Sequence, residues 1–473
     1  MRPGRYDRAP PAPRRRWNLR ATRRQQLLEE LDAIIRTLTA IALAAPSPLL
    51  LATGEVSVVI GYMLMMTSWL TMISMALDFA RTSASAFYAK RRLGAHGSGA
   101  MLPGHGPRRR VPPPTLDDWS DDLAVARTRF DVIQLRAMLH GFGLMRIDGS
   151  PKRYRVYQSG KLYSKKRPGG GFYKSSHAKY FHVQADTALI LVLMYLAIPG
   201  RMCDLSQSMG GMPEPEMSLV INFMFHFVNP WCRASRSLML YLPRFDMYAT
   251  AIEDKGSTIG CGGFGVRVVG FTDGTLIETC RPGGGQNLHN QVYDFTQFDG
   301  NHRQYGNHFL GLSFPDGLVA LHGPFGGTRH DSAMLHASSI LNHLAHLRLL
   351  GYGWWAIFGD SAFPLTSHSY RMTRQPATDG ERWFNGVWAK IRITNEWAFA
   401  HLLGIFSRLR WSLDLKMCKV DVGARVQTSS LFANLHSCFW GNQTALYFGV
   451  HTPSASFILT AAVGVLPDNV VEV

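Results

Sequence analysis

Residues 268–279 read Val-Val-Gly-Phe-Thr-Asp-Gly-Thr-Leu-Ile-Glu-Thr. The apolar residues that open this stretch are typical of a buried strand. The run reaches one carboxylate, Asp273, and then Gly274, a residue type that often marks a turn. The wider segment 265–280 is interpreted as one long strand or a strand pair. Either arrangement would place the Asp273 carboxylate at the edge of a hydrophobic core, where it can bind a ligand.

Two later acids follow a similar pattern. Asp360 ends an apolar run that begins at Trp354, and Glu396 lies in residues 392–399, which have helical character. Together with Asp273 they suggest three carboxylates in one cluster. Such a cluster suits a pair of divalent ions, because hard cations such as Mg²⁺ take oxygen ligands and two ions can assist phosphoryl transfer. Without metal, crowded carboxylates raise one another's pKa values.

The chain of 473 residues carries a net charge of +17, although only 18% of its residues are charged. This excess implies a polyanionic partner, either nucleic acid or an anionic membrane surface, and nucleic acid is the favoured interpretation. A basic run lies well inside the chain and comprises Lys152, Arg153, Arg155, Lys161, Lys165, Lys166 and Arg167. The positive charge is therefore not confined to an N-terminal tail.

The first 116 residues divide by composition into three segments. Residues 1–25 are rich in Arg and Pro and predict a disordered basic arm, and residues 26–90 predict a helical, hydrophobic region. Residues 91–116 form a linker dominated by Gly, Pro and Arg. Within the second segment, residues 56–77 carry no charge. That stretch is long enough to span a bilayer, and it is also compatible with a buried or partner-binding helix.

Residues 117–235 are predicted to be helical. An apolar helix over 188–197 is followed by a short helix near 203–209, and a third helix begins at 213–216 with Pro and Glu residues. Proline and acidic residues suit a helix N-terminus. A helix, a short helix, a glycine turn and another helix outline a helix-turn-helix, and a plain three-helix bundle is the structural alternative.

Residues 264–450 alternate between strand and helix patterns, which predicts a mixed β and then α/β fold of five strands in layers. Pro315-Asp316-Gly317 between two apolar runs is a strong hairpin signal. Residues 331–350 predict one helix and residues 395–411 another. Residues 451–473 are interpreted as a C-terminal tail.

Five further residues are candidates for function. Asp331 could support a metal or orient His330, or it could cap the helix that follows it. Arg329 and His330 are candidate DNA contacts. Arg408 and Arg410, which follow Glu396 on the same predicted helix, could bind a phosphate backbone or form a solvated face.

Nine short motifs occur in order between about residues 268 and 448. They are Phe271-Thr272-Asp273-Gly274-Thr275, Cys280-Arg281-Pro282-Gly283-Gly284, Pro315-Asp316-Gly317-Leu318, Gly323-Pro324-Phe325-Gly326-Gly327-Thr328-Arg329-His330-Asp331-Ser332, Phe358-Gly359-Asp360-Ser361-Ala362-Phe363-Pro364, Phe384-Asn385, Arg392-Ile393, Glu396-Trp397-Ala398-Phe399 and Gly441-Asn442-Gln443-Thr444. Each motif alone is weakly specific. The ordered set resembles the PIF/Harbinger family of DDE transposases, whose catalytic part is a DDE superfamily endonuclease domain of the Tnp4 type.

The resemblance implies an α/β fold: an RNase H-like catalytic domain, with a mixed sheet flanked by helices, preceded by an all-α helix-turn-helix-like region. It also implies a catalytic triad at Asp273, Asp360 and Glu396. These acids would hold divalent metal, Mg²⁺ with Mn²⁺ as a substitute, and Asp331 is a further candidate ligand. The expected function is that of a nuclear DNA endonuclease and strand transferase that uses two-metal phosphoryl transfer.

The expected partner is DNA. The resemblance also implies a separate Myb-like DNA-binding protein, and a homo-oligomer is an open alternative. The chain departs from the family at Ala400, where the family often has Gly after its Glu-x-Ala-Phe run. The alternative function is a transposase-derived, catalytically inactive DNA-binding or scaffold protein, including a form attached to a membrane through residues 56–77.

Overall fold

The computed structural model describes residues 112–157, 163–166, 172–174, 180–257, 265–281, 297–300, 304–416 and 420–473. The predicted basic arm, the hydrophobic region with residues 56–77 and most of the linker lie outside this part of the chain. Within the part that is described, no helix combines the length and the apolar character that a membrane crossing needs.

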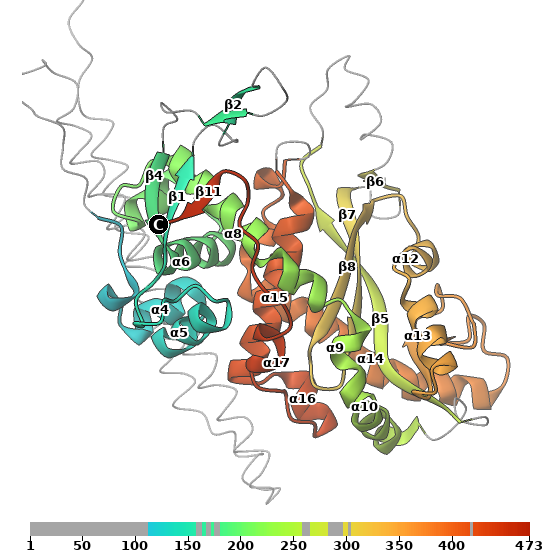
Figure 1. Cartoon of the computed structure of the whole chain (residues 1–473). Coiled ribbons are helices and arrows are strands. Elements are labelled where there is room, and N and C mark those ends of the chain that lie inside the picture. Colours follow the sequence, from blue (N-terminus) through green and yellow to red (C-terminus); the bar gives the residue numbers. More distant parts are fainter. Residues whose placement is uncertain are drawn as a thin grey trace, which may run out of the picture. The chain divides into compact units, whose positions relative to one another are not determined.

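A mixed β-sheet forms the centre of the C-terminal part (Figure 1). Its strands are β5 (Val266–Glu278), β6 (Phe298–Asp299), β7 (Gln304–Ser313), β8 (Val319–Gly326), β9 (Trp354–Gly359) and β10 (Ser369–Arg371). β7 is antiparallel to β5, whereas β9 is parallel to both β5 and β10. β6 and β8 both pair with the outer edge of β7. This mixed sheet flanked by helices is consistent with an α/β, RNase H-like fold.

Strand β5 is one long strand, so the predicted turn at Gly274 is wrong. Gly274 pairs with Leu310 of β7, and the pairing continues as far as Glu278. Tertiary pairing with β7 and β9 overrides the local turn signal of glycine. Buried Val268 and Phe271 on this strand account for its apolar first half.

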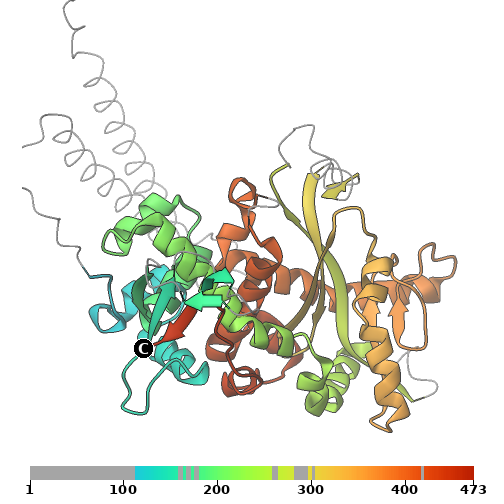
Figure 2. The same ribbon diagram turned by 45° about the horizontal axis from the view of Figure 1, so that its top comes forward.

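Helices cover both faces of the sheet. Figures 1 and 2 show α12 and α13 on one side and α15 on the other. The helices of this part are α9 (Leu238–Tyr241), α10 (Phe245–Ile252), α12 (Asp331–Ala337), α13 (Ile340–Leu349), α14 (Asp379–Ile405), α15 (Val422–Trp440), α16 (Gln443–Phe448) and α17 (Ser456–Leu459). Short 3-10 or π turns are η2 (Leu242–Arg244), η3 (Glu253–Ser257), η4 (Ser407–Arg410) and η5 (Ser412–Asp414).

Two predicted helices have different bounds from those expected. The helix predicted over 331–350 is broken into α12 and α13, because Ser339 adopts a left-handed φ of 61°. The helix predicted over 395–411 instead begins at Asp379, where Thr378 and Glu381 form a capping box. It ends at Ile405, and η4 follows it.

The region before the sheet is not all-α, which corrects the sequence prediction. β1 (Arg153–Tyr157) pairs with β4 (Tyr180–Gln184) and with β11 (Val470–Glu472) from the far end of the chain. Figure 2 shows β11, in red, beside β1. β2 (Tyr163–Lys166) and β3 (Phe172–Lys174) form a separate antiparallel pair. The C-terminal residues therefore complete a sheet instead of forming only a tail.

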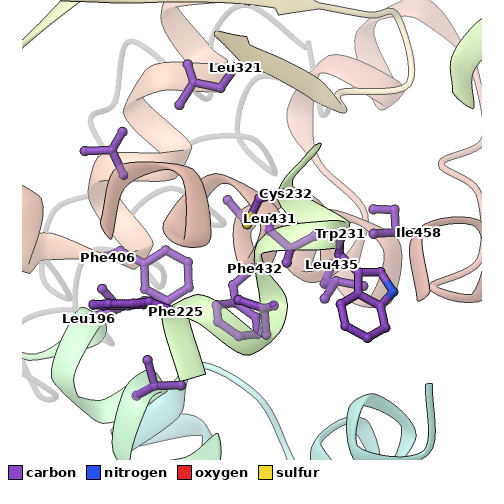
Figure 3. Close-up of a cluster of buried hydrophobic side chains, with 14 of the residues drawn as sticks. Leu196, Phe225, Trp231, Cys232, Leu321, Phe406, Leu431, Phe432, Leu435 and Ile458 are labelled. Atoms are coloured by element: carbon purple, nitrogen blue, oxygen red, sulfur yellow. The ribbon is translucent and has the colours of Figure 1, made fainter. Parts of the chain in front are cut away.

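Helices lie where the sequence predicted them around this small sheet. They are η1 (Leu116–Asp118), α4 (Asp121–Thr128), α5 (Val132–Gly141), α6 (Ala185–Ala197), α7 (Met202–Ser208) and α8 (Glu214–Ala234). Figure 3 shows Phe225, Trp231 and Cys232 of α8 among side chains of α15 such as Phe432. Helix α8 thus buries much of its surface inside the core. This burial favours a structural role for α8 over that of a helix free to enter a DNA groove.

The predicted hairpin is confirmed, and its turn is anchored to the rest of the fold. The Phe314 amide donates to the Leu318 carbonyl at 3.0 Å. Asp316 at the turn is fully buried and accepts a bond from Arg244 Nε at 3.1 Å. The side-chain Nδ2 of Asn442 donates to the backbone carbonyl oxygen of Asp316 at 2.9 Å. The Gly-Asn-Gln-Thr motif near residue 441 therefore has a structural explanation.

Replacing Asn442 with alanine is expected to lower the free energy of unfolding by about 2 kcal/mol, because it removes a helix cap and leaves a carbonyl less satisfied. Asn442 Oδ1 accepts from the Ala445 amide at 2.8 Å, which caps α16. Asn442→Asp keeps this cap but loses the donor to Asp316, so a smaller loss is expected. Urea unfolding measures both variants, and an unchanged midpoint in Asn442→Ala would contradict the assignment.

Candidate active site

Parallel pairing of β5 and β9 places Asp273 next to Asp360. Phe271 on β5 is opposite Phe358 on β9, and each acid follows its phenylalanine by two residues. The Asp360 carboxylate accepts a bond from the Ala362 amide at 2.8 Å, which fixes it just beyond the end of β9. The pairing of the two strands therefore brings Asp273, inside β5, close to Asp360, just beyond the end of β9.

A third acid, Asp331, approaches the same place from the start of α12. A side chain at Gly274 would overlap the Asp331 carboxylate, so only glycine leaves room for this approach. Asp331 is the first residue of α12, and His330 is its N-cap residue without a side-chain capping bond. The interpretation of Asp331 as a helix cap is therefore wrong, and its carboxylate faces β5 instead.

The electrostatics of the site reflect burial and crowding. Burial of Asp273, whose side chain is 20% exposed, raises its pKa to about 6; the Arg392 guanidinium opposes this rise and the Asp360 charge adds to it. Burial likewise raises the pKa of Asp331, with a further contribution from Asp360. Like charges that share a poorly solvated site disfavour full ionisation. The three aspartates therefore form one electrostatic cluster, and a bound cation would reduce the repulsion among their carboxylates.

Glu396 lies at the border of this cluster but does not join it directly. Its side chain is 62% exposed on α14. Arg392, one helical turn earlier, donates from Nη1 to Asp273 Oδ2 at 2.7 Å, and its Nη2 lies 3.9 Å from Glu396 Oε1. Arg392 thus stands between the first and the last acid of the predicted triad.

The chemical type of these side chains suits a hard divalent cation, but the side chains are not positioned to coordinate one. Carboxylate oxygens are the ligands that Mg²⁺ prefers, and Asp273, Asp331 and Asp360 supply them from two strands and a helix. Across the described residues, however, no three acidic, histidine or cysteine side chains are arranged to hold a metal ion. The position between Asp273 and Glu396 is instead taken by the positive charge of Arg392.

Mn²⁺ affinity is expected to fall below about pH 6, by up to about tenfold per pH unit, because a proton must leave Asp273 before metal binds. The raised pKa means that the carboxyl is largely protonated at pH 5 and ionised at pH 7. Calorimetry or electron paramagnetic resonance would measure the apparent Kd at each pH. Asp273→Asn should bind more weakly and without this pH dependence. An affinity that stays constant down to pH 5 would contradict the prediction.

The remaining predicted site residues differ in exposure. Arg329 and His330 are exposed just before α12, and Arg410 is exposed at the end of η4, so their predicted DNA contacts remain predictions. Arg408 is only 3% exposed; it bonds Asp414 at 2.7 Å and donates to carbonyls of residues 195, 198 and 200. The predicted DNA contact of Arg408 is therefore wrong, because its guanidinium is used inside the protein.

Two residues near the acids were not assigned roles from the sequence. Arg392 appeared only as part of a motif, although its spacing of four residues before Glu396 is the spacing of a helical ion pair. Asp299 on β6 adds negative charge near Asp331 and lies 3.3 Å from His308 Nε2. No local pattern marks Asp299, because it approaches the site through the pairing of β6 with β7.

Searches among curated proteins and among solved structures found no match. A family model does match, and the matched residues contain Asp273, Asp331, Asp360 and Glu396. They begin inside β5 and end inside α15, so they span the central sheet and the helices that carry these acids. Residues 272–433 thus match the family model described as DDE superfamily endonuclease.

Proposed function

We propose that this protein is a metal-dependent DNA endonuclease and strand transferase of the PIF/Harbinger type. The observation that carries the proposal is the cluster of Asp273, Asp331 and Asp360 inside a DDE superfamily endonuclease domain. The order of the sequence motifs supports the PIF/Harbinger assignment. The net charge of +17 supports DNA as the substrate.

The chain's own residues divide the work of the site. Strands β5 and β9 fix Asp273 and Asp360 side by side, and α12 adds Asp331 beside Gly274. These three and Glu396 would hold divalent metal, with Mg²⁺ as the natural choice and Mn²⁺ as a substitute. Two such ions, when bound, stabilise the attacking and leaving oxygens of an in-line displacement. The exposed Glu396 has the freedom to turn toward the aspartates.

Arg392 has its own part in the metal-free protein. Its guanidinium neutralises Asp273 at 2.7 Å and so limits the repulsion among the carboxylates. The same side chain places a positive charge between Asp273 and Glu396, two of the residues that would hold metal. A metal held by Asp273 would compete with Arg392 for the same carboxylate.

This ion pair is also the observation that favours a second candidate function. A protein that had lost its chemistry could keep Arg392 on Asp273 permanently and leave Glu396 in solvent. It would then be a transposase-derived DNA-binding or scaffold protein. A separate Myb-like partner is a further part of the proposal that follows from the family resemblance, and a nuclear location and a homo-oligomer are additional parts of it.

Nicking of supercoiled plasmid distinguishes the two functions. The active protein should convert the plasmid to the nicked form in Mg²⁺ or Mn²⁺, lose this activity in EDTA, and lose it again in Asp273→Asn. In EDTA, the wild type and the Asp273→Asn variant should bind the same DNA with similar affinity in a gel-shift assay. DNA binding without metal-dependent nicking, under conditions where calorimetry shows no metal binding, would instead support the inactive scaffold.

A further inference from the structure

One segment of the chain is strongly basic and lies outside the endonuclease domain. Between Pro151 and Gln184 there is no Asp or Glu. The basic residues of this segment are Lys152, Arg153, Arg155, Lys161, Lys165, Lys166, Arg167, Lys174 and Lys179. Aromatic residues alternate with them, as in surfaces that bind nucleic acid by charge and stacking.

The small sheet sorts these residues onto two faces. Tyr154 and Val156 of β1 are buried, and Tyr154 packs on Phe223 of α8 with ring centroids 5.1 Å apart. Successive side chains of a strand point to opposite faces, so Arg153 and Arg155 lie on the other face. The inner face of the sheet thus belongs to the core, and its outer face is basic.

Strand β4 adds polar and aromatic groups to this outer face. Arg155 is paired with His182, Arg153 with Gln184, and Tyr157 with Tyr180. We call the outer face, defined by Arg153, Arg155, Tyr180, His182 and Gln184, the basic sheet face. Arg153, Tyr180, His182 and Gln184 are all exposed, and Tyr180 is 49% exposed. A flat surface of charge and aromatic rings is therefore open to a partner.

Contacts within the basic sheet face hold its groups in place. The Arg155 guanidinium lies 4.7 Å from the ring centroid of Tyr180, and His182 meets the same ring edge-on at 5.5 Å. The Nε atom of Arg155 is buried without a hydrogen-bond partner among the described residues. Burial, with Arg153 and Arg155 nearby, lowers the pKa of His182, so its imidazole stays neutral near pH 7. The positive charge of the face therefore comes from the two arginines.

The acidic side chain of the neighbouring strand β11 already has a partner. Glu472 of β11 is paired with Lys152 at 3.3 Å, and neither β1 nor β4 contains an acidic residue. The antiparallel pair β2 and β3, with Lys165, Lys166 and Lys174 in its sequence, lies in the chain between β1 and β4.

We propose that the basic sheet face binds the phosphate backbone of duplex DNA and anchors it outside the active site. The inference rests on the proposed function in one respect, which is that DNA is the polyanion the protein acts on. Arg155 offers positive charge and hydrogen-bond donors to a phosphate, and the Tyr180 ring beneath it offers a flat surface to the neighbouring sugar. An anionic membrane is the alternative polyanion, and the measurements below separate it from DNA.

The test is DNA binding in EDTA, which does not depend on cleavage. Fluorescence anisotropy with a labelled duplex would compare the full chain with the variant R153A/R155A. The matched control is R136A/R382A, which removes the same charge from two exposed arginines elsewhere. The R153A/R155A variant should bind about tenfold more weakly at low salt, and the slope of log K against log salt should flatten by about 2. The control should bind within about twofold of the wild type.

Two further measurements keep the proposal falsifiable. Arg155 contacts Tyr180, so the double variant could unfold locally; Arg153→Glu changes only an exposed side chain and should weaken binding by a similar factor. Equal affinity of R153A/R155A and R136A/R382A would overturn the proposal, as would binding of phosphatidylserine vesicles in preference to DNA. Binding is measured in EDTA and needs neither metal nor cleavage, so a failure of the nuclease assignment and a failure of this face are separable.

Discussion

Replacing Asp360 with asparagine is expected to lower the rate of metal-dependent DNA cleavage by about 10³-fold or more. The asparagine side chain would keep the oxygen that accepts from the Ala362 amide at 2.8 Å, so the loop after β9 should hold its shape. It would lack the negative charge that acts on Asp273 and Asp331. The loss should therefore appear in metal binding and catalysis and not in folding.

The measurement is single-turnover nicking of plasmid DNA in Mn²⁺, with thermal unfolding followed in parallel. Asp379→Asn is the matched control, because Asp379 is an almost fully exposed acid at the start of α14 that pairs only with Arg382 among the described residues. The control should cleave at the wild-type rate. Undiminished cleavage by Asp360→Asn would show that the aspartate cluster is not where the chemistry occurs.

The parts of the site that could be predicted are those set by local sequence. An apolar run before Asp273 and another before Asp360 each predict a buried strand that leads to an acid. β9 does end just before Asp360, whereas β5 continues past Asp273, and parallel pairing brings the two acids together. The hairpin at Pro315-Asp316-Gly317 is equally local, because turn residues act through their own backbone preferences. Glu396 was a candidate from its predicted helix, and the ordered motifs gave it a role in the expected triad.

The parts that could not be predicted depend on contacts between distant residues. The bond from Arg392 to Asp273 joins residues 119 positions apart. The fit of Asp331 against Gly274 depends on how α12 packs on β5, and a glycine that serves close approach looks the same in sequence as a glycine in a turn. The three-stranded sheet includes β11 from the last residues of the chain, and no local pattern near β1 indicates this distant partner.

The DNA-binding assignments show the same limit. An arginine near an active-site helix is a reasonable candidate for a phosphate contact, and Arg408 and Arg410 are two residues apart. Only the structure separates them, because Arg408 stacks on Tyr195 at 3.8 Å and bonds Asp414, whereas Arg410 is exposed. The sequence shows how many basic residues the internal run contains but not which of them lie together. In the structure, alternation along β1 places Arg153 and Arg155 on one face of the sheet.

Replacing Arg392 with methionine is expected to have opposite effects on the metal-free and the metal-bound protein. In EDTA the free energy of unfolding should fall by about 2 kcal/mol, because Asp273 keeps its mostly buried carboxylate but loses the cation 2.7 Å away. In Mn²⁺ the loss should be recovered, since ligand binding to the folded state stabilises it. The apparent Kd for Mn²⁺ should tighten by about tenfold, because the metal no longer competes with the guanidinium.

The comparison needs a pH at which Asp273 is ionised in both proteins. Arg392 is the group that opposes the rise of the Asp273 pKa, so its removal should raise that pKa further, and pH 8 is the suitable condition. Arg392→Lys, which keeps a positive charge on α14, should resemble the wild type in EDTA and gain little Mn²⁺ affinity. If Arg392→Met loses stability equally with and without Mn²⁺, the ion pair is structural and the inactive scaffold is the better description. If Mn²⁺ restores stability, Arg392 occupies the place of the metal in the resting protein.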